Sequence, residues 1–267
     1  AYWFDASRAE DFVKDASGVL TKWKARGGSS GITALTVKAG RPTWGTAEKV
    51  NGLDVVSTRL NDGTADQLVA EGEKSCAHRT VFVVARVNQG VSMGGLIGGY
   101  NTDVGQRMNE NGTSWDWGSG GWSIETRNRD QLRRDGADTA TLSVDAGQPH
   151  ILTLYHDRDN WAMPKEWNPN ARTYDATLIP AIGKYYKWEG RNFDGDYCEI
   201  LCFDRILNES ETRIVENYLA EKWLGQAVHE EIDRGGHLSA GTTLRVAACA
   251  TLDLNGCSVT VSGLEGT

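Results

Sequence analysis

The sequence predicts an all-β fold, a sandwich or a barrel of antiparallel strands. Three apolar runs rich in β-branched residues are predicted to be buried strands: residues 80–87, 150–155 and 197–203. The chain between them is punctuated by Gly, Asn and Asp. No helix-length segment separates one strand from the next, which argues against parallel βαβ units. At 267 residues, the chain is long enough for one large β domain or two smaller ones.

Two segments are predicted to be helical. The weaker one is short and covers Ala9–Lys14. The stronger one begins at Asn208, a favoured N-cap residue, and Glu211 occupies the position that completes a capping box. Gly225 supplies the C-terminal stop. Apolar residues recur between them at helical spacing, namely Ile214, Val215, Tyr218, Leu219 and Trp223.

The composition changes after this helix. Residues 226–236 are polar and charged and are predicted to be a linker. Residues 237–267 hold very short alternating strands around the turn Asn255-Gly256. One such unit cannot bury its own face, so we expect one or two rungs of a β-solenoid. Because the chain stops just after this pattern begins, we expect it to be a piece of a longer protein.

Composition argues against several classes of function. Acidic residues (36) outnumber basic ones (28), and the formal charge is −8. Neither nucleic-acid binding nor a basic membrane-binding face is therefore expected. No run approaches the roughly 18 apolar residues of a membrane-spanning helix, so membrane insertion is not expected.

The five cysteines are an odd number, so at least one has no disulfide partner within the chain. None lies at CxxC spacing, which argues against a zinc ribbon or a redox motif. Cys198 and Cys202 share one predicted strand and are expected to be small buried hydrophobes. Cys249 and Cys257 flank a turn and have the spacing for a disulfide that the sequence does not settle.

Six stretches in the first and last parts of residues 1–225 match the motifs of one known family. The matching stretches are residues 3–7, 19–24, 41–43, 50–56, 193–207 and 218–223. Together they resemble the bacterial concanavalin-A-like (laminin-G-like) jelly-roll domains over roughly residues 1–225. Residues 250–256 resemble the autotransporter-associated β-strand repeat of bacterial surface proteins.

The resemblance implies an antiparallel jelly-roll β-sandwich with a C-terminal helix, followed by a partial β-solenoid. It also implies carbohydrate or surface-ligand binding, usually without catalysis, in a large secreted or surface-displayed bacterial protein. The expected partner is a glycan or polysaccharide, or else a host or cell-surface protein. Four residues that match the family pattern are expected to support the fold: Asp5, Glu199, Asp204 and Trp223.

Residues 193–207 resemble the closing strand of the family's jelly roll, and the acidic residues on this strand are the first candidate site. Retaining glycoside hydrolysis needs two carboxyl groups about 5–5.5 Å apart. Asp194 and Asp196 share a face by strand alternation, but Glu199 falls on the opposite face unless a β-bulge intervenes. Because the resemblance places this stretch on a structural strand, hydrolysis is an alternative rather than the main hypothesis.

The aromatic residues are the second candidate, because ten tryptophans exceed eight tyrosines and five phenylalanines. Aromatic faces stack on the C–H faces of sugar rings, and loops often carry function. Packing of long loops onto the sandwich is the competing explanation. Trp3, Trp23, Trp44 and Trp223 border family motifs and are assigned to packing. The predicted ligand-binding residues are Trp115, Trp117, Trp122, Trp161, Trp167, Tyr185, Tyr186 and Trp188.

The third candidate is a calcium site. Asp157, Asp159 and Asn160 offer three oxygen ligands in a short segment, and a solvated turn is the alternative. No other cofactor is expected, and the five histidines show no ligand spacing. The main hypothesis is a non-catalytic, lectin-like module at the bacterial cell surface or outside the cell. The alternatives are a structural or adhesive module and a glycoside hydrolase.

Overall fold

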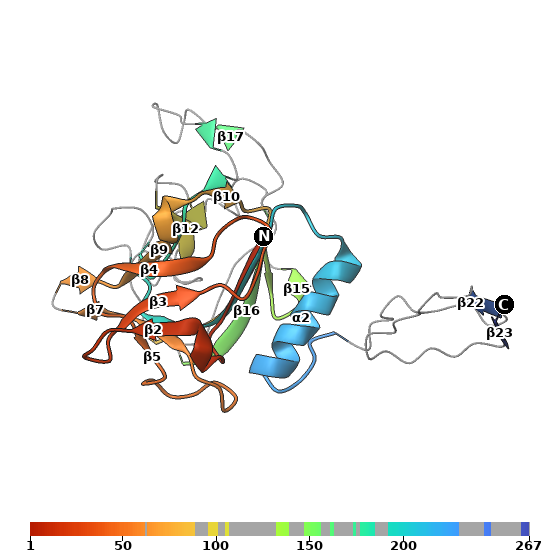
Figure 1. Ribbon diagram of the computed structural model, residues 1–267, viewed down its shortest axis with the longest axis horizontal. Coiled ribbons are helices and arrows are strands. Elements are labelled where there is room, and N and C mark those ends of the chain that lie inside the picture. Colours follow the sequence, from red (N-terminus) through yellow and green to blue (C-terminus); the bar gives the residue numbers. More distant parts are fainter. Residues whose placement is uncertain are drawn as a thin grey trace. The chain divides into compact units, whose positions relative to one another are not determined.

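The computed structural model describes residues 1–61, 63–88, 96–100, 105–106, 132–138, 147–155, 161–162, 173–174, 177–184, 192–229, 243–246 and 263–266 (Figure 1). The chain divides into two compact units, Ala1–Val228 and His229–Thr267. The predicted linker, residues 226–236, straddles this division. Each unit is described by itself below.

The larger sheet of the first unit has eight strands, all paired antiparallel. Its order is β15-β14-β16-β11-β21-β6-β5, and β1 also pairs with β21. The strands are β1 (Tyr2–Asp5), β5 (Thr43–Trp44), β6 (Val56–Thr58), β11 (Thr80–Val87), β14 (Leu132–Arg134), β15 (Ala137–Asp138), β16 (Pro149–Tyr155) and β21 (Gly195–Phe203). The three strands predicted from apolar runs are confirmed, and they form the centre of this sheet as β16, β11 and β21.

The second sheet has seven antiparallel strands in the order β13-β12-β20-β9-β4-β3-β2. They are β2 (Phe12–Lys14), β3 (Leu20–Lys24), β4 (Ala34–Ala39), β9 (Gln67–Ala70), β12 (Ile97–Gly99), β13 (Gly105–Gln106) and β20 (Pro180–Ile182). Three short pairs complete the first unit: β7 (Leu60–Asn61) with β8 (Thr64–Ala65), β10 (Cys76–Ala77) with β19 (Thr177–Leu178), and β17 (Trp161–Ala162) with β18 (Thr173–Tyr174).

Side chains from the two sheets meet in one hydrophobic core. Phe4 of β1 lies 5.4 Å from Trp23 of β3, measured between ring centroids, so this pair joins the sheets directly. Every residue of β11 is buried, and side chains from both faces of this strand belong to the hydrophobic core. The prediction of an all-β, antiparallel fold with one C-terminal helix is confirmed at this level.

The helix predicted over Ala9–Lys14 is wrong beyond its first turn. Only a 3₁₀ turn, η1 (Ala9–Asp11), forms there, and the chain continues as strand β2. The reason is tertiary packing, because Phe12 stacks against Trp44 with ring centroids 4.5 Å apart and also against Trp23. A second 3₁₀ turn, η2 (Glu71–Glu73), follows β9.

The C-terminal helix α2 (Glu209–Trp223) is confirmed together with its ends. The Asn208 side chain accepts a hydrogen bond from the Glu211 amide at 2.9 Å, and the Glu211 carboxylate accepts one from the Asn208 amide at 3.0 Å. Gly225, just past the last turn, has the left-handed φ of 76° that favours glycine at this position. In Figure 1 the helix lies beside β15 and β16.

The buried face of α2 is more polar than its sequence suggests. Leu219 and Trp223 are buried, but Ile214 is 44% exposed and Tyr218 is 37% exposed. Thr212 and Glu216 are buried instead. They lie over the outer face of the larger sheet, where they bond to hydroxyl groups of β16: Thr212 to Tyr155 at 2.8 Å and Glu216 to Thr153 at 2.7 Å.

In the second unit, the described residues form two short strands. β22 (Thr243–Val246) and β23 (Gly263–Gly266) pair in parallel, with Thr243 opposite Gly263. Across the described parts of both units, no helix combines the length and the hydropathy needed to cross a bilayer.

Candidate functional site

A β-bulge in β21 decides which acidic side chains of that strand share a face. The register against β11 shifts between Val84 and Ala85, which leaves Cys198 as the extra residue. The shift puts Asp196 and Glu199 on the same face of the sheet. A shared face is what the glycoside hydrolase hypothesis requires of these two carboxylates. Their surroundings then determine what they can do.

Glu199 is fully buried between β1, β21 and α2. Its Oε1 accepts hydrogen bonds from Trp3 Nε1 at 2.6 Å and from the Tyr218 hydroxyl at 2.9 Å. Its Oε2 accepts from Lys222 Nζ at 2.7 Å and from Trp223 Nε1 at 2.6 Å. Burial, reinforced by the neighbouring Glu199 carboxylate, raises the pKa of Tyr218, so this hydroxyl stays a donor. The carboxylate thus ties the first strand and the helix to the closing strand.

Asp196 is 1% exposed and is bound by donors from two neighbouring strands. Its Oδ1 accepts hydrogen bonds from the Ser57 hydroxyl at 2.6 Å and from the Arg59 guanidinium at 2.9 Å. Its Oδ2 accepts two from Arg86, at 3.0 Å and 2.8 Å. Arg59 also approaches Asp194, with Nε and Oδ1 3.6 Å apart. These acidic groups are therefore matched by arginines inside the fold.

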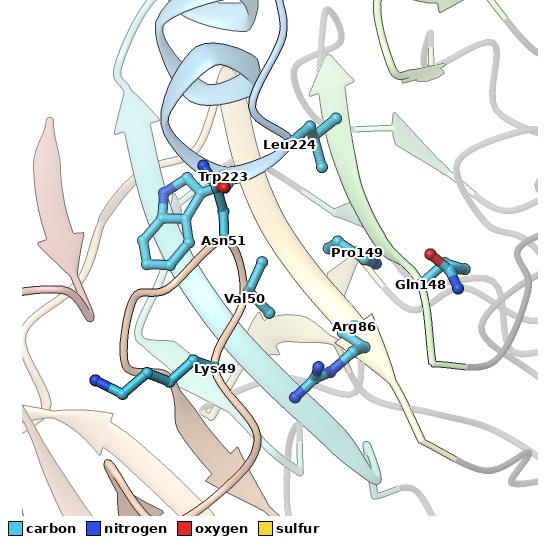
Figure 2. Close-up of a pocket in the computed structure, with 8 residues that line it drawn as sticks. All are labelled: Lys49, Val50, Asn51, Arg86, Gln148, Pro149, Trp223 and Leu224. Atoms are coloured by element: carbon cyan, nitrogen blue, oxygen red, sulfur yellow. The ribbon is translucent and has the colours of Figure 1, made fainter.

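An open hollow of about 380 Å³ lies next to this network. Figure 2 shows that its walls come from three places: a loop, the end of α2 and the start of β16, with a strand residue between them. The eight described residues that line it are Lys49, Val50, Asn51, Arg86, Gln148, Pro149, Trp223 and Leu224. Two of them carry a positive charge and none carries a negative one. Its volume falls within the roughly 300–1,000 Å³ of small-molecule sites.

The loop wall of the hollow is a tight hairpin turn. Val50 and Leu53 exchange two backbone hydrogen bonds, of 3.0 Å and 2.9 Å. The two residues between them, Asn51 and Gly52, both have positive φ, 45° and 77°, as an Asn-Gly turn of this type requires. The Asn51 side-chain amide then donates to the carbonyl oxygen of Lys222 at 2.8 Å, which fixes the turn to the end of α2.

Arg86 connects the hollow to the buried network. The side chain is 7% exposed, and its guanidinium is held by Asp196 and by the Glu48 carbonyl oxygen at 2.6 Å. These contacts use the hydrogens of Nε and Nη2, so Nη1, which lies 4.0 Å from Glu48 Oε2, is the part of the guanidinium that can donate to a ligand. Gln148 and Lys49 add exposed polar groups, and Lys49 pairs with Asp54 at 3.0 Å. The hollow therefore combines polar side chains with the apolar surfaces of valine, proline and leucine.

The sequence-predicted ligand residues fall almost entirely outside the described residues. Trp115, Trp117, Trp122, Trp167, Tyr185, Tyr186 and Trp188 all do. Trp161 belongs to strand β17, but its side chain is not described. The predicted calcium ligands Asp157, Asp159 and Asn160 also lie outside. The aromatic ligand site and the calcium site therefore remain predictions from the sequence.

The tryptophans assigned to packing do pack. Trp23 and Trp223 are 0% and 1% exposed. Trp3 lies under the Arg26 guanidinium, 4.0 Å from its ring centroid, and Trp44 donates its Nε1–H to the Ala6 carbonyl at 2.8 Å. Their assignment to the framework is confirmed.

Sequence reasoning did not single out the residues of the hollow. Two signals for it exist in the sequence. Arg86 is a charged residue inside an apolar strand, which requires a buried partner or an accessible cavity. Asn51-Gly52 is a strong hairpin signal, but these two residues were considered above only as part of a family motif. Gln148 carries no signal, because an exposed glutamine before a strand is ordinary.

Comparison with protein-family models, with curated proteins and with solved structures finds no match for this chain.

Proposed function

We propose that residues 1–228 form a non-catalytic, lectin-like carbohydrate-binding module of the concanavalin-A-like jelly-roll type. The observation that carries the proposal is the hollow, where the polar side chains of Lys49, Arg86 and Gln148 lie beside small apolar surfaces. Sugars need this combination, because their hydroxyl groups require planar polar partners while their C–H faces pack against apolar atoms. The ligand is a glycan or polysaccharide, and the parent protein is secreted or displayed on a bacterial surface.

The environment of the acidic residues supports binding over hydrolysis. A retaining hydrolase needs one carboxyl group as nucleophile and one as proton donor, both in contact with the sugar. Asp196 and Glu199 are instead buried, and all four of their oxygens accept hydrogen bonds from protein donors. In this proposal they hold the framework behind the hollow, and the hollow itself binds without chemistry.

The second unit supports a place in a long surface protein. Strands β22 and β23 pair in parallel and in register over four residues. Parallel pairing of short strands separated by one repeat is what successive rungs of a β-solenoid show. We propose that residues 237–267 form rungs of a β-solenoid.

A glycan array screened with the full chain tests the function. The best glycan is then titrated calorimetrically against wild type and the Lys49→Ala variant. Lys49 is exposed and is one of the residues that line the hollow, so we expect at least about tenfold weaker binding, or about 1.4 kcal/mol. Lys38→Ala is the matched control, because Lys38 pairs with Glu73 at 2.8 Å much as Lys49 pairs with Asp54, but lies on the second sheet.

The same experiment separates the rival hypotheses. Release of a smaller sugar from an array hit would favour the glycoside hydrolase. The absence of any hit, together with retention of the chain by whole bacterial or host cells, would favour the structural or adhesive module. A hit lost on replacing Trp115, Trp117 or Trp188 but unaffected by Lys49→Ala would move the site to the predicted aromatic stretches.

A further inference from the structure

Two cysteines and one histidine from distant parts of the chain meet near the end of the closing strand. Cys76 lies on β10, His78 follows two residues later, and Cys202 lies on β21. The backbone brings them together, because the Arg79 amide donates to the Phe203 carbonyl at 2.9 Å. One sulfur from each cysteine and one ring nitrogen of the histidine lie within 4.8 Å of one another.

The hydrogen bonds of His78 determine which ring nitrogen can bind an ion. Nδ1 lies 2.9 Å from the carbonyl oxygen of Cys76, which can only accept, so Nδ1 carries the proton. Nε2 of the neutral ring is then an acceptor, and the Tyr2 hydroxyl donates to it at 2.9 Å. A backbone carbonyl that fixes Nδ1–H is the usual outer contact of a metal-binding histidine, and an ion bound at Nε2 would take the place of the hydrogen bond from Tyr2.

Tyr2 adds an oxygen to the same group of donor atoms. It is paired with Cys202 across strands β1 and β21, and its ring packs edge-on against His78 with centroids 5.6 Å apart. Tyr2, His78 and Cys202 are each at most 2% exposed, and Cys76 is 9% exposed. Two sulfurs, one nitrogen and one oxygen thus lie close together in a buried part of the fold.

We propose that Cys76, His78 and Cys202 bind a zinc ion, with the Tyr2 oxygen on the side of the fourth coordination position. Zinc is bound in proteins by thiolate sulfur and imidazole nitrogen in tetrahedral geometry, and two cysteines with one histidine are an established three-ligand set. The ion would link β1, β10 and β21, which are far apart in sequence, and so would stabilise this end of the first unit.

The thiol environments agree with this assignment. The hydrogen bond with Cys202 lowers the pKa of Cys76. Burial, followed by the neighbouring Cys76, raises the pKa of Cys202. A dication between the two sulfurs would supply the charge that a second buried thiolate needs. Burial also raises the pKa of Cys198, which is not part of this cluster.

The test uses the full chain with Cys249→Ser and Cys257→Ser, which removes the two cysteines that lie outside the described residues. The protein is reduced, stripped with a chelator and titrated with Zn²⁺ or Co²⁺. We expect one zinc per chain, a melting temperature raised by zinc, and a cobalt spectrum with the intense bands of tetrahedral coordination and sulfur-to-cobalt charge transfer. Cys76→Ala and His78→Ala are expected to weaken zinc binding at least about a hundredfold.

Cys198→Ala is the matched control, because this cysteine is equally buried on the same strand as Cys202. It is expected to keep one zinc per chain. The proposal is overturned if the reduced parent protein binds less than about a tenth of an equivalent of zinc or if its cobalt spectrum lacks the charge-transfer bands. A Cys76–Cys202 disulfide in the purified protein, with no zinc uptake after its reduction, would overturn it as well. These outcomes do not depend on whether a glycan binds.

Discussion

Replacing Glu199 by glutamine tests whether the acidic residues of β21 serve the fold. The substitution keeps the size of the side chain, removes its charge and turns one acceptor oxygen into an NH₂ donor. That donor would face groups that themselves donate, namely Lys222 and Trp223 on one side or Trp3 and Tyr218 on the other. No orientation of the amide satisfies all four.

The expected loss of stability follows from the burial of the ion pair between Glu199 and Lys222. Removing one partner of a buried ion pair costs about 3–5 kcal/mol. Lys222 keeps a second carboxylate, since its Nζ also lies 2.7 Å from Asp5 Oδ1, and its side chain is 18% exposed. We therefore expect the lower end of that range, about 3 kcal/mol. With an m-value of about 2–3 kcal/mol/M, the urea midpoint falls by about 1 M or slightly more.

Urea unfolding followed by tryptophan fluorescence is the assay. All ten tryptophans lie before residue 224, so the signal reports on the first unit alone. Glu221→Gln is the control, because Glu221 is an exposed glutamate on the same helix, and we expect it to change stability by less than about 0.5 kcal/mol. If Glu199→Gln costs no more than the control, the buried network does not hold the framework and the reasoning fails.

Three further outcomes follow from the structure. The hydrogen bond from Arg205 lowers the pKa of Glu211 to about 2 from its ordinary 4.5. Its stabilising contribution is complete above the ordinary value and lost as pH falls towards 2, so Glu211→Gln should flatten that acid limb in a plot of urea midpoint against pH. Asn208→Ala should cost about 1 kcal/mol in urea unfolding by removing the helix cap, and Asn208→Asp should not. Gly183→Ala should cost about 3 kcal/mol, because its Cβ would lie 2.5 Å from a backbone oxygen, whereas Gly52→Ala, with similar φ but open space, should cost about 1 kcal/mol.

The parts of the fold with local signals could be predicted. The capping box of Asn208 and Glu211 and the stop at Gly225 gave both ends of α2, because these contacts form within one turn of the chain. The apolar run Thr80–Val87 gave β11 without error, since a strand buried on both faces has no polar alternation. Interactions between residues close in sequence were enough to predict α2 and β11.

Where long-range pairing dominates, prediction from sequence fell short. The bulge at Cys198 depends on the register against β11, which no local pattern encodes. The polar face of α2 arises because β16 offers Thr153 and Tyr155 as partners, so Thr212 is buried while Ile214 remains exposed. Helical periodicity alone predicts that Ile214 is buried and Thr212 is exposed.

The candidate sites also depend on contacts between residues far apart in the sequence. Cys76-Ala77-His78 places two ligand types two residues apart, but its third member is 124 residues beyond His78, on another strand. The rule that looks for CxxC spacing misses it. The hollow likewise combines residues from four separate segments, and only the fold brings Gln148 and Asn51 to the same hollow.

The most direct test of the central claim is calorimetric titration of the best array glycan against wild type and Gln148→Leu. Gln148 is exposed at the rim of the hollow, so this substitution removes the amide, keeps most of the bulk and leaves the buried network untouched. The account predicts a Kd about tenfold higher for the variant, the loss of roughly one hydrogen bond to a sugar hydroxyl. An unchanged Kd would show that the hollow is not the sugar-binding site.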